Sequence, residues 1–559
     1  MSDVIVVIGG TGVFGKRLCQ HLITQLTNID LVITSRSKKN AQLHAENLQR
    51  SARADNVVTG RVFDTKSDTL LDLLSEIAPD IVVDCSGPFQ LANHSTAEIV
   101  LKAGAHYLDL ADARVYLKTF SAKLDTEAVT CRKLAIAGCS STPTLSTCVV
   151  RSLTDRWQRI DTIDIAITLG GKSDVGKSVV AAILSYTGKP IPSFDRGELG
   201  VTSGWGISRR IAVGDLGERL VSPVETLDAE HLSHEFTVKN RVSFSAGLES
   251  TLEHRSLQLL SWLRKHRVIP SPEVLAPFLL KVRSVSRIST SDRGGMVVNV
   301  TGLDENGSRA RNEWLLLAEH DDGPYVPVLP AAAMIRRLLN EELTPGATLG
   351  SERLNLQDIE NEMSTHAITT QTKKTAAQHS IFEHSLGEET FGKMPSALQL
   401  FHRASASTVW VGKGVVNMGS WPSKIIAKVF GFPSAGNNIP ITVTVDHELD
   451  DLEEWQERWT RTFANTSFRS LLKLTDDKRL TESFPPFTFN IGVNANKKQL
   501  SMPVTGWRLG FITLPEFLAP VSDAKEYQDA QGRFCFDVKL SHPLIGLIAH
   551  YQGWLEEKG

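Results

Sequence analysis

The sequence predicts three folded parts: an α/β domain with a doubly wound parallel sheet at residues 1–142, an α+β domain at 143–354, and a β-rich α+β domain with an antiparallel sheet at 380–559. In the first part, short apolar runs alternate with helical patterns, which is typical of parallel strands joined by crossover helices. In the last part, apolar and polar residues alternate along several segments, as in antiparallel strands with one buried face. The polar stretch 355–379, in which Gln and Thr are frequent, predicts a linker, part of which could be helical.

The composition is that of an ordinary globular protein and excludes several classes of function. With 559 residues, the chain is too long for one hydrophobic core. Its 22% charged residues and net charge of −3 give no electrostatic reason to expect a nucleic-acid partner. The six cysteines form no CxxC pair and no His cluster completes a zinc set, so we expect reduced thiols and no metal site. There is no signal-peptide pattern and no run of about 20 apolar residues, so we expect a cytoplasmic protein.

The first strand, predicted at Val4 to Ile8, is followed by a glycine-rich loop and then by a helical pattern. The loop residues, which fit both GxGxxG and GxxGxxG, are Gly9, Gly10, Thr11, Gly12, Val13, Phe14 and Gly15. Such a loop turns tightly, lets the backbone approach a pyrophosphate, and presents the N–H groups of a helix amino terminus to that anion. Because the loop lies between a strand and a helix, it predicts a Rossmann domain that binds a dinucleotide. The alternative is a glycine-rich turn without a ligand.

The second strand, predicted at Asp30 to Thr34, ends in a basic segment rather than an acidic one. A cofactor without a 2′-phosphate usually meets an acidic side chain here, which binds the ribose hydroxyls. This chain instead offers Ser35, Arg36, Ser37 and Lys39. Hydroxyl and cationic groups suit the 2′-phosphate of NADP. We therefore predict NADP(H) as the cofactor, with a solvated basic turn as the alternative.

Two more strand ends are predicted to contribute to the cofactor site. Asp64 follows the strand predicted at 57–63, and would cap a helix or face the adenine. The segment after the strand predicted at 81–83 contains Cys85, Ser86, Gly87, Pro88 and Phe89. Ligands bind at strand ends of a doubly wound sheet, and a Ser-Gly-Pro turn there lets the backbone approach a nicotinamide ribose.

Side chains that could exchange a proton gather around the strand predicted at 106–110. The nicotinamide transfers the hydride while the protein supplies the proton, and our catalytic candidates for this role are His106, Tyr107, Asp109 and Asp112. Each has a structural alternative: Asp109 could cap a helix, and His106 could be a core histidine with satisfied hydrogen bonds. The Tyr-x-x-x-Lys spacing of short-chain dehydrogenases is absent at Tyr116, which is followed by Lys118.

Four segments of the first 150 residues resemble the saccharopine dehydrogenase-like family of NADP-dependent oxidoreductases. They read VIGGTGVFG, VVDCSGPF, GAHYLDLADA and AGCSSTPTLS. The resemblance extends to about residue 350. It implies a Rossmann domain followed by an α+β domain whose mixed sheet carries substrate contacts and often a dimer interface, so a homodimer is one expectation. It also implies a late helix, at Pro330 to Asn340 in this chain, that packs back on the first domain.

The chain departs from the family pattern at two points that concern the substrate. The family often has Gly-Glu after the fifth strand, where this chain has Ala111 and Asp112, and Pro-Gly where this chain has Pro143 and Thr144. We also find no arginine cluster suited to a substrate with several carboxylates. We therefore do not carry over amino-acid substrates to this chain.

Further segments resemble a branch of this family that has an additional C-terminal domain of unknown function. AAILSYTGKP, FSAGLEST, LLSWL and SDRGGM lie in the middle of the chain, and GRFCFDVKLSHPLIGLIAHYQGWL lies near its end. Alternating segments at 440–446, 487–493, 499–503 and 534–540 predict a curved antiparallel sheet preceded by a helix or two. A sheet curled around an apolar pocket would be a ligand-holding module.

Gly171 to Ser178 matches GxxxxGK[ST], the pattern of a phosphate-binding loop. A predicted strand, Ile163 to Leu169, precedes it, and a predicted helix, Val179 to Tyr186, follows it. A nucleotide triphosphatase also needs a strand that ends in a magnesium-binding Asp, and the one tempting strand, ending at Asp84, belongs to the first domain. We therefore favour a Lys177 that faces solvent or contacts substrate over ATP binding.

Residues 244–282 carry leucines at roughly helical spacing, followed by the basic residues 264–267. The apolar positions include Leu252, Leu257, Leu260, Trp262 and Leu263. This pattern favours core or interface helices. The alternatives are an apolar lid over a lipid-like or carrier-bound substrate, and a surface that rests on a membrane.

Together these features predict an NADP(H)-dependent reductase or dehydrogenase that acts on a C=N, C=O or activated C=C bond of a small-molecule substrate. The missing arginine cluster and the apolar helices favour a lipid-like or carrier-bound substrate over an amino acid. The alternative is an NADP(H)-binding scaffold or sensor without turnover, whose C-terminal module binds a lipid or a partner.

Overall fold

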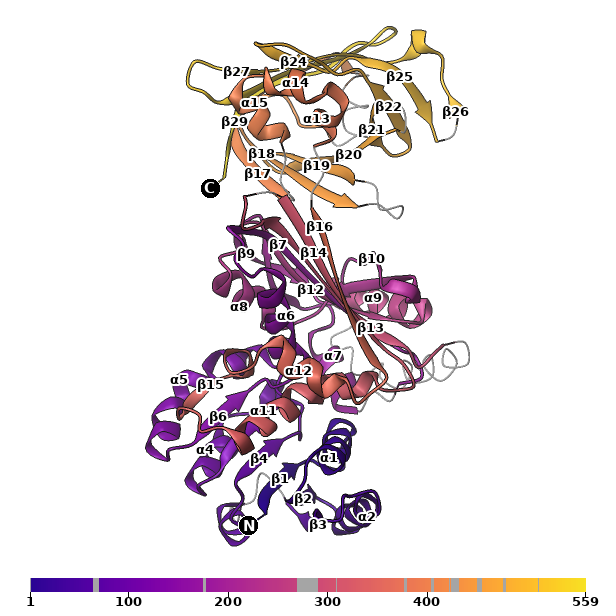
Figure 1. The fold of residues 1–559 in the computed structure, drawn as a ribbon. Helices are drawn as coiled ribbons and strands as arrows, with labels where there is room; N and C mark the ends of the chain where they lie inside the picture. Colours follow the sequence, from indigo (N-terminus) through magenta and orange to yellow (C-terminus); the bar gives the residue numbers. More distant parts are fainter. Residues whose placement is uncertain are drawn as a thin grey trace. The chain divides into compact units, whose positions relative to one another are not determined.

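The computed structural model describes residues 2–63, 70–173, 177–268, 290–307, 309–376, 380–403, 407–421, 423, 432–449, 455–475, 479–510 and 512–558. The chain forms two compact units (Figure 1). The first contains Met1–Asp155, Ile163–Val300 and Asn312–Lys373, and the second contains Arg156–Thr162, Thr301–Arg311 and Lys374–Gly559. The predicted fold class is confirmed, with a parallel sheet, an α+β region and a separate antiparallel sheet. No helix in the described part of the chain is long and apolar enough to cross a membrane.

The first sheet is the predicted doubly wound parallel sheet, with the strand order β15-β6-β5-β4-β1-β2-β3. Its strands are β1 (Asp3–Ile8), β2 (Ile29–Ser35), β3 (Val57–Val62), β4 (Ile81–Asp84), β5 (His106–Asp109), β6 (Leu134–Ala137) and β15 (Gly346–Leu349). The intervening helices are α1 (Val13–Gln25), α2 (Lys38–Gln49), α3 (Leu70–Ile77), α4 (Ser95–Lys102) and α5 (Arg114–Thr130). Every residue of β4 and β6 is buried, as expected for short strands covered by helices on both faces.

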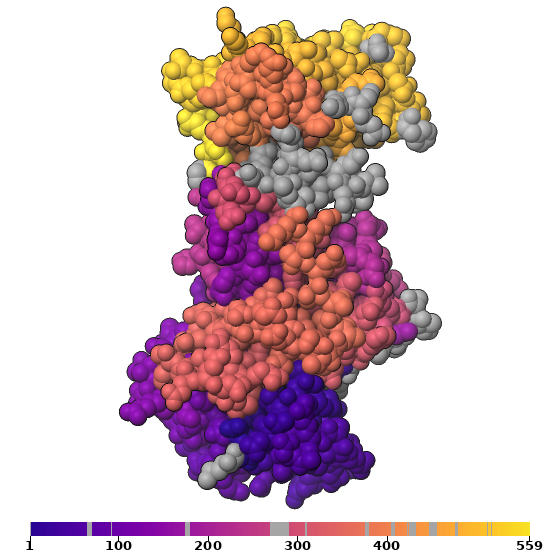
Figure 2. All heavy atoms as spheres, in the orientation of Figure 1, coloured from indigo at the N-terminus to yellow at the C-terminus, as the bar shows by residue number. Residues whose placement is uncertain are grey.

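The late part of the first unit returns to this sheet. Helix α11 (Leu329–Asn340) packs against α1, as predicted for 330–340. Strand β15, which the sequence analysis does not predict, pairs in parallel with β6, with Gly346 opposite Leu134. Figure 2 shows the late segment, in salmon, on the surface beside the indigo N-terminal residues.

The segment 355–379, predicted as a linker that could be partly helical, contains a helix and also a strand that the sequence analysis does not predict. Helix α12 (Leu356–Met363) begins at Asn355, whose side chain accepts a hydrogen bond from the Asp358 amide. Strand β16 (Ile368–Ala376) is the last strand of the second sheet. Most of its described side chains are exposed. An edge strand of this kind can be polar, which explains why the segment resembles a linker in composition.

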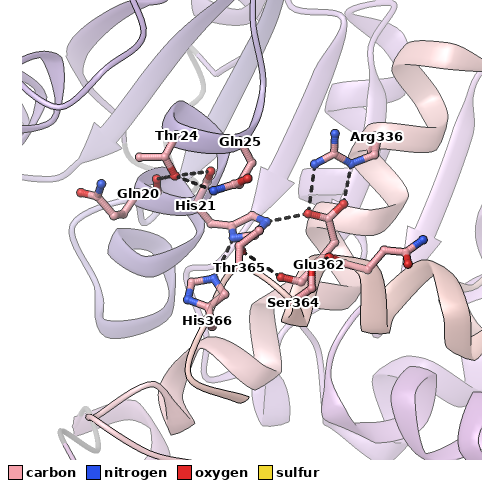
Figure 3. A network of polar contacts seen from close by, with 10 residues as sticks. Gln20, His21, Thr24, Gln25, Arg336, Glu362, Ser364, Thr365 and His366 are labelled. Atoms are coloured by element: carbon pink, nitrogen blue, oxygen red, sulfur yellow. Dashed lines mark hydrogen bonds and ion pairs between the residues drawn. The ribbon is translucent and has the colours of Figure 1, made fainter. Parts of the chain in front are cut away.

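A buried polar network attaches α1 to the late helices (Figure 3). The Nε2 atom of His21 lies 2.7 Å from Glu362 Oε2, and Arg336 donates to both oxygens of the same carboxylate. The other ring nitrogen of His21 lies 2.9 Å from Nε2 of His366. Although burial alone would raise it, the hydrogen bonds from His21 and Arg336 lower the pKa of Glu362 to about 2. The ionised carboxylate therefore stabilises the packing of these helices.

We expect Glu362→Gln to lower the free energy of unfolding by about 2 kcal/mol at pH 7, because the amide offers one acceptor where the carboxylate offers two. The folded-state pKa is depressed, so the contribution of Glu362 is present above its unfolded pKa and is lost as the pH falls towards 2. Urea unfolding at pH 7 and at pH 3 would test this. The difference in free energy of unfolding between variant and wild type should be smaller at pH 3 than at pH 7. An equal difference at both pH values would contradict the proposed contribution of the ionised Glu362.

The second sheet has nine strands in the order β10-β11-β12-β7-β13-β14-β16, with β8 beside β12 and β9 beside β8. The strands not yet given are β7 (Arg159–Leu169), β8 (Pro190–Asp195), β9 (Glu198–Ser203), β10 (Arg209–Ala212), β11 (Glu218–Pro223), β12 (Arg241–Leu248), β13 (Gly294–Leu303) and β14 (Arg309–Ala318). Its helices are α6 (Ser146–Leu153), α7 (Lys177–Tyr186), α8 (Asp228–Glu235) and α9 (Thr251–Lys265).

Helix α9 lies within the region 244–282 for which the sequence predicts apolar helices. Leu257 and Leu260 are buried, as expected for a core helix. Leu252, Leu259 and Trp262 are more than half exposed. Residues 269–282 of the predicted region lie outside the described residues.

The second unit contains a 13-stranded sheet in the order β23-β24-β27-β28-β29-β17-β18-β19-β20-β21-β22-β25-β26. Its longer strands are β17 (Ser407–Met418), β18 (Gly436–Leu449), β19 (Trp455–Phe463), β20 (Thr466–Leu474), β25 (Val504–Leu509), β27 (Val521–Gln528), β28 (Phe534–His542) and β29 (Gly546–Glu557). The short ones are β21 (Leu480–Phe484), β22 (Phe487–Ile491), β23 (Asn494–Ala495), β24 (Gln499–Ser501) and β26 (Ile512–Thr513). Three helices precede the strands, α13 (Ile381–Leu386), α14 (Glu388–Gly392) and α15 (Ser396–His402), and α13 and α15 contact the sheet.

Candidate functional site

The glycine loop between β1 and α1 leaves the amino terminus of the helix open. Gly12, the residue before α1, makes no side-chain capping bond, and the first turn contains no acidic residue. The Gly12 amide donates to Gly9 O over 2.9 Å, which closes the loop, and the Lys16 amide donates to Gly12 O over 3.0 Å. The amides of the first turn therefore point to a place where an anion would complete their hydrogen bonds.

Two of the loop glycines are required by close approaches of the backbone. Gly9 has φ +72°, and a Cβ there would lie 3.0 Å from the Cα of Ser86. A Cβ on Gly15 would lie 2.3 Å from Gly9 O and 2.8 Å from the Cα of Gly10. The helix, the loop and the segment after β4 are therefore in direct backbone contact, which only glycine permits.

The end of β2 carries hydrogen-bonded hydroxyls and exposed cations. Thr11 Oγ1 donates to Ser35 Oγ over 3.1 Å, and the hydroxyl of Ser37 accepts from the Asn40 amide at the start of α2. Arg36 and Lys39 are exposed, and neither forms an ion pair with a described residue. The hydroxyls thus fix the turn next to the glycine loop, and the two cations are available to an anion beside it.

The segment after β4 presents only part of the predicted cofactor contacts. Ser86 and Pro88 are exposed, and the Ser86 amide donates to the buried carboxylate of Asp84 over 2.8 Å. Cys85 is partly buried. Phe89 is buried and its ring packs against Tyr116, with 5.4 Å between ring centroids, so its side chain belongs to the core. Asp64 lies outside the described residues.

Asp109 and Tyr107, two of the catalytic candidates, are fully buried at the end of β5. Oδ1 of Asp109 accepts from the amides of Ala111 and Gly138, at 3.0 and 2.8 Å, and Oδ2 is bonded to the hydroxyl of Tyr116 at 3.0 Å. That hydroxyl lies 3.2 Å from the hydroxyl of Tyr107. Burial raises the pKa of Asp109 to about 7. This carboxyl group therefore joins the ends of β5 and β6, an anchoring position without access to a substrate.

The other two candidates lie at opposite ends of the same region. His106 is the first residue of β5, so it lies at the edge of the sheet away from the glycine loop, and its Nδ1 accepts from the Leu134 amide over 3.0 Å. Burial lowers the pKa of His106 to about 4. Asp112 is exposed beyond the carboxyl end of β5 and accepts from Gln90 Nε2 over 3.2 Å. Of the four, Asp112 is the one that is exposed at the edge where ligands of doubly wound sheets bind.

Residues of the α+β domain, which the sequence analysis does not identify, lie close to this edge. Nε of Arg114 lies 3.5 Å from Oε1 of Glu225, and its Nη1 lies 3.2 Å from Oε2 of Glu230. Burial, together with the negative charge of Asp112, raises the pKa of the Tyr186 phenol. No sequence motif marks these residues, because the fold brings together segments about a hundred positions apart.

The described part of the Walker-like loop already holds a carboxylate. Glu249 Oε2 accepts from the amides of Gly171 and Ser291, each over 2.9 Å, and its Oε1 accepts from the Ser291 hydroxyl over 2.9 Å. Arg219 lies 3.6 Å from the same carboxylate. Residues 174–176 lie outside the described residues. An internal anion therefore occupies the beginning of the loop, where a phosphate-binding loop would leave its amides free.

Neither metal sites nor disulfides are found where the structure can be described. In that part of the chain, no group of three His, Cys, Asp or Glu side chains is arranged to hold a metal ion. All six cysteines are free.

Comparisons with known proteins identify both ends of the chain. Residues 5–135 match the family described as saccharopine dehydrogenase NADP binding domain, and residues 394–555 match the domain of unknown function DUF4166. Apo saccharopine dehydrogenase (L-Glu forming) from Saccharomyces cerevisiae is 11% identical with a TM-score of 0.48, covering 67% of this chain and 100% of its own. DAP dehydrogenase of C. glutamicum in complex with DAP is 14% identical with a TM-score of 0.36, covering 64% and 98%. A comparison with curated protein sequences finds no match.

The two family matches confirm the resemblance seen in the sequence, including the additional C-terminal domain. They also agree with the structure, because the first match covers β1 to β6 and the second covers most of the antiparallel sheet. The chain combines an N-terminal saccharopine dehydrogenase NADP-binding domain with a separate C-terminal DUF4166 domain.

Proposed function

We propose that the protein is an NADP(H)-dependent oxidoreductase that transfers a hydride to or from a C=N, C=O or activated C=C bond. The observation that carries this proposal is that a helix amino terminus without a side-chain cap lies next to the end of strand β2. The cations there, Arg36 and Lys39, form no ion pair with a described residue. The first feature suits the pyrophosphate shared by NAD and NADP, and the second suits the 2′-phosphate that only NADP has.

In this proposal, each part of the carboxyl edge has its own task. The amides of the glycine loop hold the pyrophosphate, while Arg36 and Lys39 bind the 2′-phosphate. Ser86 and Pro88 lie beside the place where a nicotinamide ribose would enter. When bound, the nicotinamide supplies the hydride. Asp112, hydrogen-bonded to Gln90, is the predicted side chain best placed to exchange a proton with substrate.

The substrate would lie on the side of Asp112 that faces the α+β domain. The side chains near that side carry both positive and negative charges, because Arg114 is paired with Glu225 and Glu230. Paired charges of this kind leave no surplus of cations for a substrate with several carboxylates. This supports a substrate with few charges, as the sequence analysis expects.

We expect Arg36→Ala to weaken NADPH binding at least tenfold and to change NADH binding less than twofold. The guanidinium contributes a charge-assisted contact only where a 2′-phosphate is present, and such contacts contribute about 1.5–3 kcal/mol. Titrating each cofactor against intrinsic fluorescence measures both affinities. Arg50→Ala is the matched control, because Arg50 is also exposed but follows the far end of α2. If the affinities for NADPH and NADH fell equally, this turn would not be the binding site of the 2′-phosphate.

Turnover separates the enzyme from the alternative of a cofactor-binding scaffold or sensor. The assay follows NADPH absorbance with panels of imines, ketones and enoyl thioesters, at saturating cofactor. Consumption with one class would support the oxidoreductase and name the bond it reduces. NADPH binding without consumption on any panel would instead support the scaffold.

A further inference from the structure

The antiparallel sheet of the second unit encloses a cavity of about 400 Å³. Small-molecule sites in proteins commonly have volumes of roughly 300–1,000 Å³. The cavity is lined by residues of β18 to β22, β25, β27, β28 and β29, and by one residue of α15. It lies wholly among residues of the second unit. It is therefore a feature of the DUF4166 domain and is separate from the cofactor loop.

The lining follows from the two-residue period of the strands. On β27, Ser522, Ala524 and Glu526 line the cavity, whereas Val521 and Tyr527 are exposed on the other face. Along β28, Phe534, Phe536, Val538, Leu540 and His542 line the cavity in the same alternate manner. These strands thus direct one face, mostly apolar, towards the cavity, as the sequence analysis anticipates for a pocket-forming sheet.

The charged side chains in the lining are already paired. Arg461 Nη2 lies 3.1 Å from Glu482 Oε1, and its Nη1 donates to Ser470 Oγ over 2.7 Å. The carboxylate of Glu526 is paired with His402. A second carboxylate brought beside Glu482 would lose its hydration without gaining an unpaired cation, which is costly in an apolar interior. The cavity therefore favours an uncharged ligand.

Tyr551 carries the phenol hydroxyl of the cavity lining. This hydroxyl forms no hydrogen bond with a described residue, although only 8% of Tyr551 is exposed and it lines the cavity. Burial raises the pKa of Tyr551 to about 12, so the phenol carries its proton at neutral pH and can donate. The oxygen is not fully buried, so an atom of a ligand in the cavity can reach it. An acceptor atom on that ligand would accept the hydrogen bond of the phenol.

We propose that this cavity binds a neutral lipid: a hydrocarbon chain with one uncharged acceptor, such as an ester or ketone oxygen, that accepts the hydrogen bond of Tyr551. The apolar lining contacts the chain and excludes it from water, which is the main source of affinity. The phenol fixes the position of the polar end. Because the ion pair of Arg461 and Glu482 stays intact, a free fatty acid binds less well than its ester.

The test uses the full chain and the neutral dye Nile red, whose fluorescence rises in apolar surroundings. Methyl decanoate and decanoate then compete with the dye at pH 8. We expect the ester to displace the dye at a concentration at least tenfold below that of the carboxylate. Absence of dye binding, or displacement by the carboxylate at the same or a lower concentration, would overturn the proposal.

Two variants connect binding to the cavity itself. Ala524→Phe places a ring inside it and is expected to weaken dye binding at least tenfold, whereas Val521→Phe, on the outer face of β27, leaves it within twofold. Tyr551→Phe is expected to weaken the binding of methyl decanoate at least threefold, while the affinity for the dye stays within twofold of wild type. Far-ultraviolet circular dichroism and thermal unfolding check that each variant is folded. Folded Ala524→Phe with wild-type affinity would overturn the proposal, and if that variant does not fold, an unchanged ester affinity in Tyr551→Phe would do so.

Discussion

The Gly15→Val variant is expected to lose dinucleotide binding by more than a hundredfold. A Cβ at this position would lie 2.3 Å from Gly9 O and 2.8 Å from the Cα of Gly10, and both contacts are backbone atoms of the loop. The loop cannot yield by rotating a side chain, so helix α1 must move away from it. That displacement removes the amides of the first turn from the position of the pyrophosphate. The same overlap is expected to cost about 3 kcal/mol of folding free energy.

Calorimetric titration of the variant with NADPH and with NADH measures the expected loss, which should be equal for both cofactors because the pyrophosphate is common to them. Gly392→Val is the matched control. It makes the same change in helix α14 of the other unit, where a Cβ would meet no atom within 4 Å. Binding by Gly15→Val within fivefold of wild type would refute the role of the loop. Thermal unfolding distinguishes a folded variant without a site from one that does not fold.

Replacing Asp109 by alanine is expected to lower the free energy of unfolding by about 3 kcal/mol, because the amides of Ala111 and Gly138 lose their shared acceptor in a fully buried position. Asp109→Asn retains that acceptor and places an amide donor opposite the Tyr116 hydroxyl, as a protonated carboxyl group would. It should therefore unfold like wild type below pH 4, where this carboxyl group is protonated in both the folded and the unfolded state. Urea unfolding of both variants measures the two effects. An alanine variant as stable as the asparagine variant would contradict the anchoring role.

The stability difference between wild type and Asp109→Asn should depend on pH. The folded-state pKa of Asp109 is raised to about 7, so its favourable contribution is complete below the unfolded pKa near 4 and is lost as the pH rises through 7. Wild type should therefore lose on the order of 4 kcal/mol relative to the asparagine variant between pH 4 and pH 8. Parallel stability profiles over this range would show that the buried carboxyl group does not titrate as described.

The cofactor loop could be predicted because its signal is local. A β-branched strand, closely spaced glycines and a helix follow one another within the first 25 residues, and the basic turn comes after the next strand. Strand β15 gives no such signal. It is the four-residue segment from Gly346 to Leu349, and it pairs with a strand that is far away in the sequence. Its place in the sheet depends on tertiary contacts that no local pattern encodes.

The catalytic candidates show a different limit. Tyr107 and Asp109 lie in strand β5, close to the strand end where site residues are expected, but both side chains are fully buried. Strand β5 is covered on both faces, so consecutive residues along it are buried. In an antiparallel strand with one exposed face, buried and exposed residues alternate, but β5 gives no such pattern from which to tell a core residue from a site residue. The contacts of Arg114 depend on how two regions of the first unit meet, which the sequence does not show.

Because β15 belongs to the first sheet, the N-terminal domain is not formed by one continuous segment of the chain. Until residue 346 has left the ribosome, β6 remains an unpaired edge whose four residues are apolar. Such an edge invites pairing with other chains. A gene fragment that stops after the cofactor domain would encode all the residues of the glycine loop and still lack the strand that closes its sheet.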